Sequence, residues 1–287
     1  SGTDALSGID RFECRAGNPT TIAAATFATC MSGAAFNLSA GAQHFDVRSI
    51  DRAGNTSSVA SYDWTIDTSA PTVTITKGPA ALTNQTQATV EFSGTDTDGT
   101  IVSYSCKWDA GAVTSCSSPL SSSGTLSSGS HTFSVTATDN AGNVSSAATI
   151  SWVVDTTGPV LSITSKPASV TNSKAANFVL SATDANGVDS IECQVDDGGF
   201  KACTTTPSYT GLADGNHRFE ARAKDKAGNI SATIGYSWAI DTSKPTLKLT
   251  SPSSPWTNVR AVTVTIEAKD TNVATGLPAL TIQCKVN

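Results

Sequence analysis

The sequence predicts an all-β protein of tandem β-sandwich domains with about seven strands each. Three observations lead to this expectation: few helix-forming residues, apolar side chains that alternate with period two, and landmarks that recur at a nearly constant interval. The 287 residues include 38 Ser and 42 Thr, but only 5 Glu, 12 Leu and 1 Met. Because Val, Ile and Thr favour strands, this composition argues against a helical bundle or a helix-rich enzyme.

The recurring landmarks are an Asp-x-Ala-Gly-Asn motif, a tryptophan thirteen residues after its first aspartate, an Asp-Thr pair and a proline. The three copies of the motif are spaced by 88 and then 86 residues. Matches at fixed offsets over several landmarks indicate tandem repetition. The first aspartates are Asp51, Asp139 and Asp225, the tryptophans Trp64, Trp152 and Trp238, the paired aspartates Asp67, Asp155 and Asp241, and the prolines Pro71, Pro159 and Pro245.

The landmarks divide the chain into four repeats, at residues 1–70, 71–158, 159–244 and 245–287. Alternating apolar residues, such as Val73 and Ile75, predict strands in each repeat. By alignment, the first repeat lacks its first strands and the last contains only its N-terminal part. Half a sandwich leaves an apolar face and open edges, so something completes both ends. The favoured explanation is a window on a longer array, and the alternative is strand exchange between subunits.

Seven cysteines fall into three close pairs and one remainder. No Cys-x-x-Cys occurs, which argues against a zinc knuckle or a thioredoxin-type site. Evenly distributed close pairs are typical of disulfides, and therefore of an oxidising compartment outside the cytosol. The expected bridges staple small modules, and the last cysteine finds its partner outside the chain given. The pairs are Cys14–Cys30, Cys106–Cys116 and Cys193–Cys203, and the remainder is Cys284.

The order of an Asp-Thr-x-x-Pro linker, alternating strands, paired cysteines and an Asp-x-Ala-Gly-Asn-x-Ser turn resembles the bacterial immunoglobulin-like repeats of large cell-surface and extracellular proteins. The resemblance implies Ig-like sandwiches, like beads on a string, in an adhesin stalk or fibre. It also implies a structural, non-catalytic role at the bacterial cell surface or outside the cell. The short-range cysteine pairs depart from the family pattern, because many such repeats have no cysteine.

Two interpretations of the Asp-x-Ala-Gly-Asn motif stay open. In the first and favoured one it is a tight turn, in which glycine takes positive φ and the Asp and Asn side chains bond nearby N–H groups. In the second, its aspartate meets the linker aspartate near a domain junction and binds calcium, which takes six to eight oxygen ligands. No other cofactor is expected. The candidate ligands are Asp51, Asp67, Asp139, Asp155, Asp225 and Asp241.

The aromatic and basic residues give weak signals for binding. Trp64, Trp152 and Trp238 alternate with apolar neighbours and are expected in the core, whereas Trp108 and Trp256 are candidates for exposed contacts. A net charge of −6, with 18 scattered basic residues, argues against nucleic acid as a partner. No apolar run approaches the ~18–20 residues of a membrane span.

The histidines do not repeat in register. His131 and His217 precede a phenylalanine by two residues, whereas His44 precedes one by a single residue. One residue of shift moves a strand side chain to the opposite face, so a repeated catalytic site is not expected. The expected partners are neighbouring repeats or copies of the chain in a fibre. The alternatives are a module that binds a glycan or a host protein, or a segment of a virus tail fibre.

Overall fold

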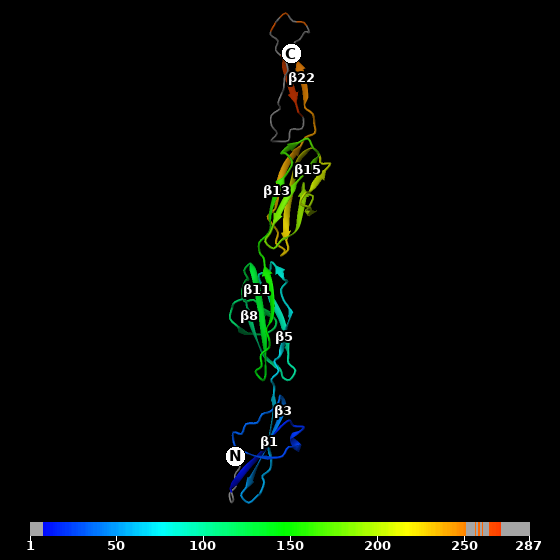
Figure 1. The fold of residues 1–287 in the computed structure, drawn as a ribbon. Helices are drawn as coiled ribbons and strands as arrows, with labels where there is room; N and C mark the ends of the chain where they lie inside the picture. The colour runs from blue at the N-terminus through cyan, green and yellow to red at the C-terminus, as the bar shows by residue number, and fades with distance from the viewer. Residues whose placement is uncertain (1–7, 251–255, 257, 259, 261–263, 271–287) are drawn as a thin grey trace. The chain divides into compact units, whose positions relative to one another are not determined.

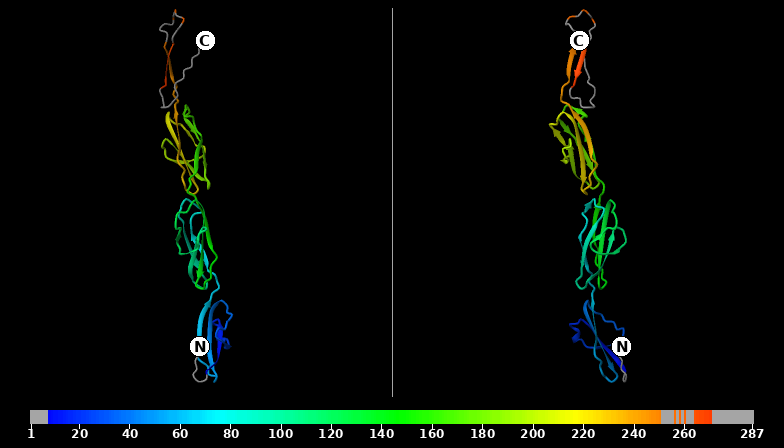
Figure 2. Two further views of the ribbon diagram at one scale, coloured as in Figure 1. Left: turned by 90° about the vertical axis from the view of Figure 1, so that its left-hand side faces the viewer. Right: turned by 180° about the vertical axis from the view of Figure 1, so that it is seen from behind.

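The computed structural model describes residues 8–250, 256, 258, 260 and 264–270. In this part of the chain the regular structure is β-strand, apart from one short 3-10 helix, η1 (Ile22–Ala24) (Figures 1 and 2). The predicted all-β class is confirmed. No helix of the described residues is long and apolar enough to cross a membrane.

The chain forms two compact units. One unit contains Ser1–Ala80, Gln87–Leu126 and Ser130–Trp152, and the other contains Ala81–Thr86, Ser127–Gly129 and Val153–Asn287. The boundary between them falls inside residues 71–158, so this division differs from the four predicted repeats. The division into four repeats therefore stays a prediction, whereas the β-sheets follow the repeats closely.

Residues 71–158 form a sandwich of two sheets (Figure 1). The smaller sheet has the strand order β10-β7-β5, and the larger has the order β6-β12-β11-β8-β9. Phe92 in the smaller sheet packs against Tyr104 and Phe133 in the larger, with ring centroids 5.1 and 6.0 Å apart. The strands are β5 (Thr72–Lys77), β6 (Leu82–Thr83), β7 (Thr89–Thr95), β8 (Ile101–Trp108), β9 (Thr114–Cys116), β10 (Leu120–Ser121), β11 (Gly129–Asp139) and β12 (Ala148–Val154).

Residues 159–244 repeat this plan. A five-stranded sheet, in the order β14-β21-β20-β17-β18, is accompanied by the pairs β13-β16 and β15-β19. The core centres on Phe178 and Phe219, whose rings stack at 4.0 Å. The strands are β13 (Val160–Ser165), β14 (Val170–Thr171), β15 (Ala175–Asn177), β16 (Val179–Thr183), β17 (Val188–Val195), β18 (Lys201–Cys203), β19 (Ser208–Thr210), β20 (Gly215–Asp225) and β21 (Ile234–Ile240).

The two outer parts each contain one sheet within the described residues. The first sheet has the order β2-β1-β3-β4, and β22 pairs with β23 near the other end. Phe45 is half-buried in the first sheet, whereas its equivalent Phe133 is fully buried. Leu247 and Leu249 are 63% and 62% exposed. The strands are β1 (Ile9–Gly17), β2 (Ala28–Cys30), β3 (Gly41–Asp51), β4 (Ala60–Ile66), β22 (Thr246–Thr250) and β23 (Thr265–Lys269).

Candidate metal centres

The Asp-x-Ala-Gly-Asn motif forms a hydrogen-bonded turn at the end of a long strand. Alternation along β11 places Asp139 on the core face at the last strand position, where it is 1% exposed. Its Oδ1 accepts hydrogen bonds from the N–H groups of Ala141 and Asn143, both at 2.8 Å. Gly142 takes a φ of 94°, which favours glycine. The turns at Asp51 and Asp225 have the same Asp–Asn bonds.

The asparagine of the turn also holds the linker that precedes its own repeat. Asn143 Nδ2 donates to the carbonyl oxygen of Asp67 at 3.2 Å. Asn229 Nδ2 donates to the carbonyl oxygens of Asp155 at 2.8 Å and Thr157 at 3.1 Å. Each of these bonds joins residues more than 70 positions apart, so the motif fixes the entering chain as well as making a turn.

Three carboxylates meet beside the first of these linkers, and we call them the first cluster: Asp67 after β4, Asp96 after β7 and Asp139 at the end of β11. One ligand oxygen from each lies within 4.8 Å of the others. Both carboxylate oxygens of Asp96 and Oδ2 of Asp67 are buried and accept no hydrogen bond. Such buried acceptors are costly when unpaired, and a cation would satisfy them.

Gly99 leaves the room into which these oxygens point. A Cβ atom at this position would lie 2.6 Å from Asp96 Oδ2 and 2.9 Å from Asp67 Oδ2, and would also clash with Asn140 Oδ1. Three oxygen atoms therefore converge on one side of this glycine. Oxygen donors grouped in this way are the kind that calcium prefers.

Asp155, Asp184 and Asp225 form the second cluster, with ligand oxygens again within 4.8 Å of one another. Here the carboxylates have hydrogen-bond donors of their own. Asn186 Nδ2 donates to Asp155 Oδ2 at 2.8 Å, and the N–H groups of Asn186 and Gly187 donate to Asp184 Oδ1 at 2.8 and 3.1 Å.

The hydroxyl and the backbone N–H of Thr157 hold the pKa of Asp155 below its ordinary value, although burial opposes them, and the Asn186 amide adds to the effect. The neighbourhood of Asp155 thus already favours a charged carboxylate.

The sequence anticipated part of this arrangement. The structure brings Asp67 to Asp139 and Asp155 to Asp225. Asp51 and Asp241 join neither of the two clusters that the described residues contain; Asp51 bonds Asn55, and Asp241 Oδ1 accepts from the N–H of Ser243 at 2.9 Å.

The interpretation of the motif missed the third member of each cluster, Asp96 or Asp184. A signal was available, because these aspartates end equivalent strands 88 residues apart. Asp270 holds the next equivalent position, and its Oδ1 is buried without a hydrogen-bond partner. Calcium binding itself stays a prediction.

Three disulfides join the cysteine pairs that the spacing predicts. Each bridge links one edge strand to the strand beside it: Cys14–Cys30 joins β1 and β2, Cys106–Cys116 joins β8 and β9, and Cys193–Cys203 joins β17 and β18. Cys284 lies outside the described residues, so its predicted external partner stays a prediction.

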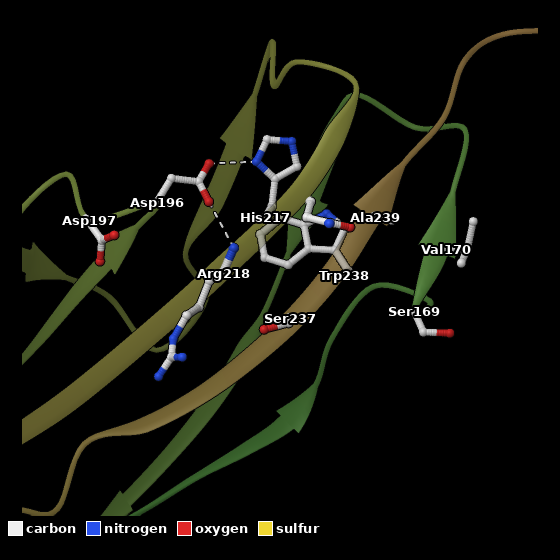
Figure 3. Close-up of a pocket in the computed structure, with 10 residues that line it drawn as sticks. Ser169, Val170, Asp196, Asp197, His217, Arg218, Ser237, Trp238 and Ala239 are labelled. Atoms are coloured by element: carbon white, nitrogen blue, oxygen red, sulfur yellow. Dashed lines mark hydrogen bonds and ion pairs between the residues drawn. The ribbon is translucent and has the colours of Figure 1, made fainter. Parts of the chain in front are cut away.

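A hollow of about 590 Å³ lies on the side of residues 159–244 (Figure 3). Its polar groups serve one another: Asp196 accepts from His217 Nδ1 at 2.6 Å and from the N–H of Arg218 at 2.9 Å. Trp238 in its wall is only 3% exposed. The hollow therefore offers no open aromatic face on which a sugar would stack.

The remaining tryptophans correct one expectation. Trp108 is half-buried and packs against Phe133 and Trp152, with ring centroids 4.7 and 6.0 Å apart, so it is not an exposed contact residue. The pairing of β8 with β11 sets Trp108 opposite Phe133 and explains this position. Trp256 is 87% exposed, as expected.

Comparison with known families gives a match to the central part of the chain. Residues 74–156 match the family described as bacterial Ig-like domain. This part of the chain is similar to a bacterial Ig-like domain. The match covers β6 to β12 and most of β5, and so includes strands of both sheets and the complete Asp-x-Ala-Gly-Asn turn.

Two curated proteins are similar to a longer stretch of the chain. The chain is 30% identical to exoglucanase B of Cellulomonas fimi in an alignment of 212 residues, and the match covers 70% of the chain and 19% of that protein. It is 31% identical to chitinase A1 of Niallia circulans in an alignment of 217 residues, and the match covers 69% of the chain and 30% of that protein. The chain thus spans less than a third of the length of either relative.

Solved structures that match the chain include fibronectin(III)-like modules of Clostridium thermocellum CbhA. That match has 16% identity and a TM-score of 0.37, and covers 59% of this chain and 94% of the other. A tetra-tandem repeat from the extending region of a large adhesion protein has 20% identity and a TM-score of 0.32, and covers 86% of this chain and 71% of the other.

Proposed function

We propose that this chain is a non-catalytic structural repeat segment of a bacterial extracellular or cell-surface fibre, of the kind that forms an adhesin stalk. The recurring asparagine bonds to the linker carry the proposal. Asn143 and Asn229 tie the entering chain to the repeat that follows, at equivalent positions. A load on the chain is then borne by defined hydrogen bonds in each repeat, as a mechanical role requires.

The disulfides support the same role. Because each bridge closes a loop inside one sheet, the loop does not lengthen when its repeat is pulled open. In the chain-entropy treatment a ten-residue loop stabilises a module by about 2.7 kcal/mol. This is a large contribution for a domain of under 90 residues, whose apolar burial is modest.

Single-molecule force extension tests the proposal. We expect repeated unfolding steps of similar length, each of which grows by about 35 Å when the ten-residue loop is released by reduction. Steps that do not change on reduction, or a chain that extends without resistance, would contradict it. A hydrolytic activity against polysaccharides retained by residues 1–287 would contradict the non-catalytic assignment.

We further propose that the carboxylates beside the linkers form a divalent-cation site, with calcium as the cation. The buried, unpaired oxygens of Asp67 and Asp96 support this proposal, with Asn140 Oδ1 beside them. Water would complete the six to eight ligands that calcium takes. A ligand that binds only the folded state raises stability. The midpoint temperature of thermal unfolding should therefore be higher in millimolar calcium than in chelator. An unchanged midpoint would contradict calcium binding.

The two curated relatives favour one second candidate function, an accessory module of a polysaccharide-degrading protein. Their names describe a glucanase and a chitinase, and the matched stretch is a minor part of each. In this role the sandwiches would bind or space a polysaccharide. A glycan-array screen, with Trp256→Ala as the variant of an exposed aromatic, separates this function from a plain stalk: specific binding that the variant loses would favour it.

A further inference from the structure

The two aspartate clusters occupy equivalent places, yet they differ in how their charge is balanced. In the first cluster three carboxylate oxygens, two from Asp96 and one from Asp67, are buried without a donor. In the second cluster, none of the buried carboxylate oxygens of Asp155, Asp184 and Asp225 is left without a partner. The difference lies in the residues around the clusters, because the three aspartates are common to both.

The first substitution is at the second position after the strand-end aspartate. The first cluster has Asp98 there, an exposed carboxylate that accepts from Ser69 Oγ of the linker at 3.0 Å. The second cluster has Asn186, whose amide donates to Asp155 Oδ2 at 2.8 Å. Asp98 thus adds negative charge next to its linker, whereas Asn186 supplies a hydrogen-bond donor to the linker aspartate.

The second substitution is inside the Asp-x-Ala-Gly-Asn motif, at its variable position. The motif beside the first cluster has Asn140 at this position, and its Oδ1 lies close to the aspartate oxygens near Gly99. The second has Lys226, whose Nζ and Cε would lie 3.3 Å from a Cβ atom at Gly187. Gly99 and Gly187 each follow their strand-end aspartate by three residues. The second cluster therefore has an ammonium group on the side where the first has an oxygen.

We infer that the two junctions are not equivalent in this chain: the first cluster binds a divalent cation, and the second is closed by Asn186 and Lys226 and does not bind one. The inference rests on the proposed cation site and assigns it to one place. A cation at the first cluster would face three carboxylates and one amide oxygen, with no ammonium group beside Gly99. A cation at the second would face three carboxylates, an amide already donating to Asp155, and the repulsion of a nearby ammonium group.

Reciprocal exchange of these two residues tests the inference on the full chain. The variant D98N/N140K gives the first cluster the residues of the second, and N186D/K226N does the reverse. Both exchanges use residues that the same turn already accommodates in the other repeat, and circular dichroism checks that each variant folds. Equilibrium dialysis against about 1 mM calcium, the range of extracellular modules, counts the bound ions.

We expect D98N/N140K to bind one calcium ion fewer than the parent chain and N186D/K226N to bind one more. The variants D96N and D184N give a second comparison, in which only D96N should lose an ion. If D184N also loses one, or if the exchanges leave the count unchanged, the inference is overturned while the proposed cation site survives. If the parent chain binds no calcium, the proposed cation site fails and the inference fails with it.

Discussion

The two central repeats have the same plan but differ where the linker enters. Beside Asp67, buried carboxylate oxygens are left unpaired, whereas both carboxylate oxygens of Asp155 accept hydrogen bonds, from an amide, a hydroxyl and one backbone N–H. The hydrophobic framework is insensitive to this difference, because Phe133 and Phe219 are fully buried in both repeats. A tandem array thus keeps its cores constant and varies its junctions through a few polar residues.

The largest effect that we expect should be the same in both repeats. Removing Cys106–Cys116 or Cys193–Cys203 by paired Cys→Ser substitution opens a loop of equal length, and each should destabilise its own repeat by about 2.7 kcal/mol. Denaturant unfolding of the variants, followed separately for each repeat, checks this. Losses that differ by more than a factor of two would show that the frameworks are less alike than their cores suggest.

The asparagine that holds the linker should distinguish the repeats. Asn229 makes three side-chain hydrogen bonds, to Asp155 O, Thr157 O and Asp225 Oδ2, so Asn229→Ala should cost about 2–3 kcal/mol. Asn143 makes two, so Asn143→Ala should cost about 1–2 kcal/mol. Calorimetry of the two variants measures both losses.

The matched control for this pair is Asn55→Ala in the first sheet. The side chain of Asn55 donates to Asp51 Oδ2, within its own turn. We expect a loss of about 1 kcal/mol for this variant. An equal loss in all three variants would show that the linker bonds add nothing to the turn itself.

Alanine substitution of the glycine beside each cluster should have a calcium-dependent effect at the first cluster and a calcium-independent effect at the second. A methyl group at residue 99 would enter the space shared by Asp96 Oδ2 and Asp67 Oδ2, so Gly99→Ala should abolish stabilisation by calcium. Gly187 has a φ of 98°, so Gly187→Ala should cost about 1 kcal/mol with or without the ion. Thermal unfolding in chelator and in calcium measures both effects, and retained calcium stabilisation in Gly99→Ala would contradict the proposed cation position.

The smallest effect concerns pH. Burial lowers the pKa of His217, but the Ala213 carbonyl and the Asp196 carboxylate outweigh it and raise this pKa above the ordinary 6.5. A group whose pKa is raised on folding stabilises the folded state fully at pH values below its unfolded-state pKa. This stabilisation is lost as the pH rises through the folded-state pKa. Stability should therefore fall modestly as the pH rises above about 6.5.

His217→Gln should remove this dependence, which unfolding measured from pH 5.5 to 8.5 would detect. Glutamine is a suitable replacement, because Gln43 is at the equivalent place in the first sheet. Gln43 is opposite Trp64 and donates to a carbonyl four residues earlier, as His217 is opposite Trp238 and bonds Ala213. A pH dependence that persists in the variant would assign it to another group.

Most of the fold follows from sequence periodicity. Alternation along β11 and β20 predicts which side chains are buried, and the repeated motif predicts the turns, because both depend on neighbours close in the chain. The prediction that Trp108 is exposed was wrong, because Trp108 packs against Phe133, a residue on another strand. Asp96 and Asp184 were missed for the same reason: they reach the linker only through the tertiary fold.

Hydrogen exchange of the two turns, measured with and without calcium, tests whether only the first cluster binds the ion. The amides of Ala141 and Asn143 donate to Asp139 in the first cluster, and those of Gly228 and Asn229 donate to Asp225 in the second. Mass spectrometry of peptides that cover residues 139–143 and 225–229 follows both in one sample. We expect calcium to slow exchange in the first peptide and to leave exchange in the second unchanged. Equal protection of both peptides, or none in the first, would contradict it.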